Sequence, residues 1–100
     1  MNLAGTYLIG GSAGWDNTGS VSGVRTLGLR KNGTTLLALQ TNFPDTSSDV
    51  GYQNVQAVTV MSAADYVELV AFQNNGIAIP ITVAAQVSPE LWMIRISSFL

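Results

Sequence analysis

Residues 24–42 read VRTLGLRKNGTTLLALQTN and form the clearest structural element of the sequence. The pair Asn32-Gly33 divides two runs in which leucine recurs at every second position, as it does at Leu27 and Leu29. Both central residues of a type I′ turn take positive φ, and Asn-Gly tolerates that conformation best. The stretch therefore predicts an antiparallel hairpin with a two-residue turn.

The rest of the chain continues this β pattern. Short apolar runs alternate with clusters of Gly, Asn, Asp, Ser and Thr, and no window repeats apolar residues at helical spacing. Further strands are expected at residues 5–15, 53–61, 66–73, 77–83 and 91–97, with a proline directing residues 77–83 to a sheet edge. We therefore expect one domain, residues 1–100, folded as an all-β antiparallel sandwich or jelly roll.

The composition indicates association with other subunits. Hydrophobic residues make up 47% of the 100 residues and charged residues only 10%, whereas charged residues make up about a quarter of an average domain. A domain of this size has a small interior, so we expect another subunit to cover much of the apolar surface. The alternative is a monomeric sandwich whose exposed face is rich in Thr, Ser and Ala.

The chain lacks the side chains that most catalytic and ion sites need. It has no His, which removes the commonest general base and the commonest transition-metal ligand, and no Cys, which removes thiolate metal sites. Lys31 is the only lysine, and at a turn tip it is expected to be a solvated cation. Four basic residues and a net charge of −2 do not make a nucleic-acid surface. We expect no enzyme, no membrane span and no signal peptide.

Four stretches resemble the C1q-like domains of the C1q/tumour-necrosis-factor superfamily, in their bacterial and bacteriophage form. Residues 4–9 (AGTYLI) resemble the family's Gly-x-Tyr strand, and residues 25–34 resemble its hairpin with a basic-Asn-Gly turn. Residues 62–69 (SAADYVEL) are similar to the family's Gly-Asp-x-Val-x-Leu strand, with Ala64 where glycine is usual. The closing run at 92–96 is similar to the last strand of the family.

The resemblance implies a jelly-roll protomer in a closed homotrimer, with a structural or adhesive role and no catalysis. It points to a virion or extracellular protein, such as a bacteriophage capsid decoration subunit or a tail fibre or spike module, whose partners are itself and other virion or surface proteins. The family's strands before the Gly-x-Tyr strand have no counterpart here, so the sandwich is expected to be reduced, with a sheet edge that a partner covers. The alternative is a carbohydrate- or host-receptor-binding module.

The same resemblance places residues 53–61 and 91–97 in one sheet that faces the threefold axis. One face of the last strand carries Leu91, Met93 and Arg95, and the other carries Trp92, Ile94 and Ile96. The second set has three large apolar residues and is predicted to fill the core, so the first set is predicted to form the trimer interface. On residues 53–61 we assign Ala57 and Thr59 to that interface, although alternation leaves the face of Val58 and Val60 open.

Two loops carry the remaining candidates for binding. Oxygen ligands for Ca²⁺ occur together at Asp45, Thr46, Ser48 and Asp49, but their spacing matches no calcium-loop signature, and the alternative is a solvated loop. No other cofactor is expected. Trp15 and Tyr52 lie beside the long loops and could stack on a sugar ring. For Trp15 the alternative is a partly buried aromatic at the end of a strand.

Overall fold

The computed structural model describes residues 3–16, 23–43, 50–74, 81 and 88–98. In these residues the protein is all-β and contains no helix. The six strands are β1 (Gly5–Asp16), β2 (Arg25–Lys31), β3 (Thr35–Asn42), β4 (Val50–Met61), β5 (Val67–Gln73) and β6 (Glu90–Ser98). The expected strand at 77–83 falls mostly outside the described residues; Ile81, which is described, forms an isolated bridge with Trp15.

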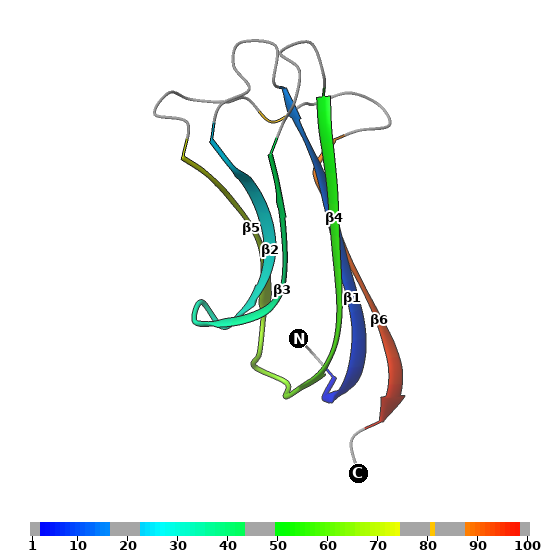
Figure 1. Ribbon diagram of the computed structural model, residues 1–100. Coiled ribbons are helices and arrows are strands. Elements are labelled where there is room, and N and C mark those ends of the chain that lie inside the picture. Colours follow the sequence, from blue (N-terminus) through cyan, green and yellow to red (C-terminus); the bar gives the residue numbers. More distant parts are fainter. Residues whose placement is uncertain (1–2, 17–22, 44–49, 75–80, 82–87, 99–100) are drawn as a thin grey trace.

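The strands form two antiparallel sheets of three strands each (Figure 1). Sheet A has the order β4-β1-β6, and sheet B has the order β3-β2-β5. Each sheet therefore contains strands from both halves of the chain. In sheet A, β1 pairs with β4 and β6, and in sheet B, β2 pairs with β3 and β5. The antiparallel all-β fold is confirmed, and so is the placement of residues 53–61 and 91–97 in one sheet.

The hairpin turn has the backbone that Asn-Gly favours. Asn32 has φ of 56° and Gly33 has φ of 73°, so both residues lie in the left-handed region. The N–H of Thr34 donates to the carbonyl of Lys31 at 3.2 Å and closes the turn between β2 and β3. The prediction of two left-handed residues at this turn is confirmed.

Replacing Gly33 by valine should lower stability. A β-branched side chain resists positive φ, and this conformation costs about 1–3 kcal/mol outside glycine. A Cβ at Gly33 would also lie 3.1 Å from the hydroxyl of Tyr66. We expect the Gly33→Val variant to melt well below the parent in a thermal scan, while Thr34→Val, one residue later, melts close to it. Equal melting of Gly33→Val and the parent would contradict the turn assignment.

The core lies between the two sheets, on alternate positions of the strands. Period-two alternation points every second side chain of a strand toward the opposite sheet. The buried apolar cluster consists of Tyr7, Ile9 and Ala13 of β1, Leu27 and Leu29 of β2, and Val55 and Met61 of β4. The strands β1, β2 and β4 therefore supply the core, and the edge strands β5 and β6 supply none of these fully buried residues.

A buried amide joins the sheets on the side where β3 lies near β4. Gln53 is 1% exposed, and its Nε2 donates to the carbonyls of Arg25 at 2.8 Å and Gln40 at 3.0 Å. Its Oε1 accepts a hydrogen bond of 2.7 Å from Nε1 of Trp15. The side chain of Gln40 also accepts from the backbone N–H of Asn54 at 2.9 Å. This amide is fully paired, so it fixes sheet A to sheet B at low cost.

Candidate interaction surface

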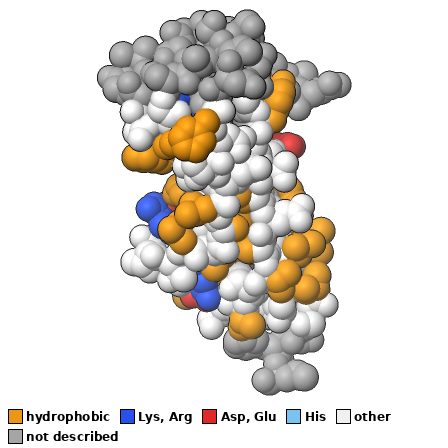
Figure 2. Space-filling model, viewed as in Figure 1, with side chains coloured by type: hydrophobic (Ala, Val, Ile, Leu, Met, Phe, Trp, Pro, Cys, Tyr) orange, Lys and Arg blue, Asp and Glu red, His pale blue; other side chains and the backbone are white. Residues whose placement is uncertain are grey.

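The outer face of sheet A is apolar and open to solvent. Residues directly opposite each other in paired strands point to the same face, and Leu8 pairs with Val58 on one side and Ile94 on the other. Val58 is 61% exposed and Ile94 is 54% exposed. We define the sheet A patch as Leu8, Val58, Val60, Trp92 and Ile94. In Figure 2, apolar side chains gather on the side of the molecule along which β6 runs.

A glycine lets the aromatic ring of this patch lie against the sheet. Gly10 pairs with Trp92, and a Cβ built on Gly10 would lie 2.1 Å from Cζ2 of the indole. The ring therefore rests on the backbone of β1, where any other residue would push it away. Trp92 keeps 38% of its surface exposed, so it adds a broad apolar area to the patch.

The outer face of sheet B carries a second apolar group. Gly28 pairs with Leu39 and Val70, and a Cβ on Gly28 would lie 2.8 Å from Cδ2 of Leu39. Leu39 is 56% exposed, and Phe72 on the same face is 59% exposed. This face is interrupted by charge, because Arg30 and Glu68 form an ion pair of 3.1 Å there. The sheet A patch contains no charged residue and is the more uniform surface.

The Arg30–Glu68 pair is partly open to water and contributes little. Nε and Nη2 of Arg30 donate to the two carboxylate oxygens of Glu68 at 3.1 and 3.3 Å. The hydrogen bond and the charge of Glu68 raise the pKa of Arg30 above its ordinary value. Water screens exposed pairs of this kind, so they add little to stability.

The structure corrects the assignment of faces on β6. Met93 pairs with Ile9, and Arg95 pairs with Tyr7, so both lie on the inner face of sheet A that carries the core. Leu91 lies on the same inner face by alternation. These three residues were predicted at the trimer interface, and they do not belong to the outer face.

The other two residues of the predicted interface, both on β4, also lie on the inner face. Ala57 pairs with Ile9, and Thr59 pairs with Tyr7, which places both on the inner face as well. Ala57 packs against the core cluster. Trp92 and Ile94, predicted to fill the core, instead lie on the outer face. The expectation that residues 92, 94 and 96 fill the interior is therefore wrong, and the outer-face set is Val58 and Val60 with Trp92 and Ile94.

Arg95 holds the start of the chain. Its Nε and Nη2 donate to the carbonyl of Ala4 at 3.1 and 2.9 Å. A Cβ on Gly5 would lie 2.7 Å from the Nε of Arg95, so the guanidinium lies close against β1. This arginine ties the segment before β1 to β6 within one subunit.

The two aromatic candidates for sugar stacking have opposite environments. Trp15 is 3% exposed, its Nε1 is bonded to Gln53, and the guanidinium of Arg25 lies 6.0 Å from its ring centroid. A ring so buried has no face open to a ligand, and Trp15 is a core residue. Tyr52 is 58% exposed and pairs with Gly14 on the outer face of sheet A, so it remains open for contact.

The calcium candidates cannot be placed, and the described residues offer no other metal site. Asp45, Thr46, Ser48 and Asp49 lie outside the described residues. Within the part of the chain that the structure describes, no three His, Cys, Asp or Glu residues gather to hold a metal ion. The same part contains no helix long and apolar enough to cross a membrane.

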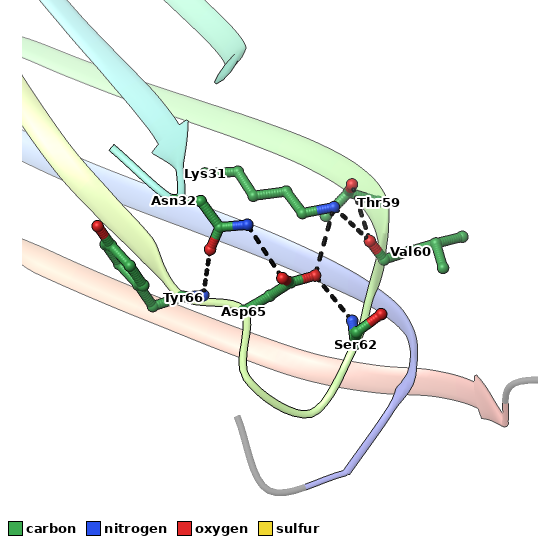
Figure 3. A network of polar contacts seen from close by, with 7 residues as sticks. All are labelled: Lys31, Asn32, Thr59, Val60, Ser62, Asp65 and Tyr66. Atoms are coloured by element: carbon green, nitrogen blue, oxygen red, sulfur yellow. Dashed lines mark hydrogen bonds and ion pairs between the residues drawn. The ribbon is translucent and has the colours of Figure 1, made fainter. Parts of the chain in front are cut away.

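A polar network that the sequence did not indicate joins two turns at one end of the sandwich (Figure 3). Nδ2 of Asn32 donates to Asp65 at 3.0 Å, and its Oδ1 accepts from the N–H of Tyr66 at 3.0 Å. The N–H of Ser62 donates to the other oxygen of Asp65 at 2.8 Å. These hydrogen bonds therefore connect the hairpin turn to the turn between β4 and β5.

Lys31 belongs to the same network, which corrects its expected role as a solvated cation. Its Nζ donates to the carbonyl of Val60 at 2.8 Å and lies 3.6 Å from Asp65. The N–H of Ser62 first, then the amide of Asn32, and to a smaller extent the charge of Lys31 lower the pKa of Asp65 below its ordinary value.

The lowered pKa of Asp65 predicts a loss of stability in acid. A carboxyl group whose pKa is lower in the folded state stabilises the fold above its unfolded pKa of about 4, and this contribution disappears as the pH falls through the folded value. Asp65→Asn should melt below the parent at pH 7, and the difference should shrink as the pH is lowered below 4. Thermal scans at several pH values test this, and a difference independent of pH would contradict it.

Comparison with known proteins adds no relative to this description. The chain matches no protein-family model, no curated protein and no solved structure.

Proposed function

We propose that the protein is a non-catalytic structural and interaction module that works as a homotrimer and associates through the outer face of sheet A. The observation that carries this proposal is the sheet A patch, in which Val58, Ile94 and Val60 are 61%, 54% and 48% exposed. Monomeric soluble proteins seldom leave a contiguous apolar sheet face open to water, and such faces mark contacts with partners.

The shape of the single chain supports the same proposal. Its radius of gyration is 15.2 Å, whereas a compact domain of 100 residues has a value of about 13 Å. Among the described residues, more large apolar side chains are exposed than buried. A single subunit therefore buries too little apolar surface to be stable alone, and association would bury the rest.

The trimeric state and the location in a virion are proposed from the resemblance to C1q-like domains. In that family a sheet face surrounds the threefold axis, and here sheet A has the apolar outer face that such packing needs. The bacterial and bacteriophage form of the family makes a virion component, such as a capsid decoration subunit or a tail fibre module, the preferred setting. The absence of His and Cys throughout the chain agrees with a role in assembly.

Sedimentation equilibrium at micromolar concentration tests the assembly. We expect a mass three times that of the 10.5 kDa chain. A well-folded monomer would overturn the proposal and favour the alternative, a carbohydrate- or receptor-binding module in which Tyr52 makes contact. A folded dimer would retain association and overturn the threefold arrangement. Cryo-electron microscopy of particles from the source of the sequence tests the location in a virion.

A further inference from the structure

The edge strand β6 is apolar on both faces and exposed on both. Every residue from 91 to 97 is exposed. Trp92 and Ile94 point to the outer side at 38% and 54% exposure, and Leu91 and Met93 point to the inner side at 44% and 36%. In the described part of the chain, β6 pairs only with β1, and its other edge borders no strand (Figure 1).

The first half of this strand lacks the devices that protect sheet edges. Natural edges are short, or they carry lysine, proline, a bulge or inward-pointing charge. β6 is nine residues long and contains no proline. Its inward-pointing charge, Arg95, and the irregularity in its pairing with β1 at Ile96 both lie in the second half, so residues 91–94 have no such protection. Strands that are apolar on both faces are typical of sheet interiors. An extended chain is the partner whose backbone can pair with the free N–H and C=O groups of this edge.

We propose that β6 pairs antiparallel with β6 of a second copy, so that sheet A continues across two subunits. The twofold axis stands perpendicular to the sheet at the centre of the pair. This symmetry keeps outer face beside outer face and inner face beside inner face. Up to Arg95, each residue therefore faces one with the same parity of number, so the apolar outer-face residues Trp92 and Ile94 meet outer-face residues of the second copy.

The charges of β6 restrict the register of this pairing. With Met93 on the axis, Trp92 faces Ile94 of the partner subunit; with Ile94 on the axis, Trp92 faces Ile96 of the partner subunit, at the position where the pairing of β6 with β1 is irregular. In both registers Arg95 lies opposite an uncharged side chain. With Arg95 itself on the axis, two guanidinium groups would face each other, which is unfavourable. The strand is therefore complementary to itself in the two registers centred on residue 93 or 94.

This inference does not rest on the proposed trimer, because it uses the edge of β6 and the inner-facing Met93. One strand pair buries less than the roughly 1,200 Å² of a stable interface. We therefore expect the contact to link units that other contacts also hold, such as trimers joined in pairs.

The absence of cysteine allows a direct test. Met93→Cys gives each chain a single thiol on the inner face of β6. In either register the two thiols lie within about 10 Å, given strand spacings of roughly 4.8 Å and a rise of about 3.4 Å per residue. A short bifunctional thiol reagent should then produce a covalent dimer at twice the 10.5 kDa chain mass on a denaturing gel. Leu39→Cys, 56% exposed on the outer face of sheet B, is the matched control.

The outcomes separate this inference from the proposed function. Crosslinking at Met93→Cys that exceeds crosslinking at Leu39→Cys, with a parent-like circular dichroism spectrum, supports edge pairing. Equal yields at the two positions overturn it, even where sedimentation shows a trimer. Oxidation without reagent then identifies the register, because antiparallel neighbours on the axis fall within disulfide range: a disulfide at Met93→Cys places residue 93 there, and one at Ile94→Cys places residue 94 there.

Discussion

Replacing Val58 by aspartate should convert the associated protein into separate subunits. Val58 belongs to the sheet A patch, paired with Leu8 and 61% exposed in the single chain. The single chain can therefore hold an aspartate there with its carboxylate in water. In the assembly each copy would bury that charge against apolar side chains, which costs several kcal/mol per carboxylate. Sedimentation velocity should show the loss of the trimer, and aggregation is the expected accompaniment as apolar surface is uncovered.

Thr34→Asp is the control for this variant. Thr34 is exposed in the hairpin turn, away from the outer face of sheet A, and the substitution adds the same charge. It should sediment like the parent. A Val58→Asp protein that remained a folded trimer would show that the outer face of sheet A lies outside the interface, whatever the number of subunits. Met93→Asp, on the inner face, is not an equivalent test, because it alters the side of β6 that carries the core.

The hairpin could be predicted from sequence because its determinants are local. Positive φ at Asn32 and Gly33 follows from the chemistry of two adjacent residues, and the alternating leucines fix which positions share a face. The strand ranges follow from the same kind of information. The six strands expected within the described residues are all present, with boundaries shifted by a few residues at most, as in the strand expected at 53–61 that the structure begins at Val50.

The faces of β6 could not be predicted in this way. Alternation shows that Trp92 and Ile94 share a face, but only the register with β1 shows which face carries the core. The expectation that the more apolar set points inward assumes that burial within one subunit decides the pattern. In β6 both faces are exposed, so apolar content alone does not show which face points toward the core.

The polar sites were missed for a different reason. Asp65 accepts from the N–H of Ser62 within its own turn, but its bond to Asn32 joins positions 33 residues apart in sequence. Lys31 has a partner for the same reason, since the fold brings the β4–β5 turn beside the hairpin. Sequence reasoning about single motifs contains no information on such pairings, which the topology of the two sheets creates.

Gln53 also makes side-chain contacts with residues distant in sequence, and its substitution tests the core. A glutamine at the start of an apolar strand reads as a surface residue, yet this one is 1% exposed and pairs with Ala13 on the inner face. Methionine has nearly the same shape and cannot donate or accept in its place. Gln53→Met would leave the indole N–H of Trp15 without its acceptor, and the carbonyls of Arg25 and Gln40 would each lose a donor.

Each buried polar group left unsatisfied costs about 1–3 kcal/mol, so we expect Gln53→Met to lose about 2–5 kcal/mol of stability. Thr34→Met is the control: a methionine introduced at an exposed position of the hairpin turn, away from the outer face of sheet A, should change stability by less than about 0.5 kcal/mol. Denaturant unfolding at one fixed protein concentration compares the two variants, because association makes the midpoint depend on concentration. If both variants unfolded at the midpoint of the parent, the amide of Gln53 would not be what fixes sheet A to sheet B beside β3 and β4.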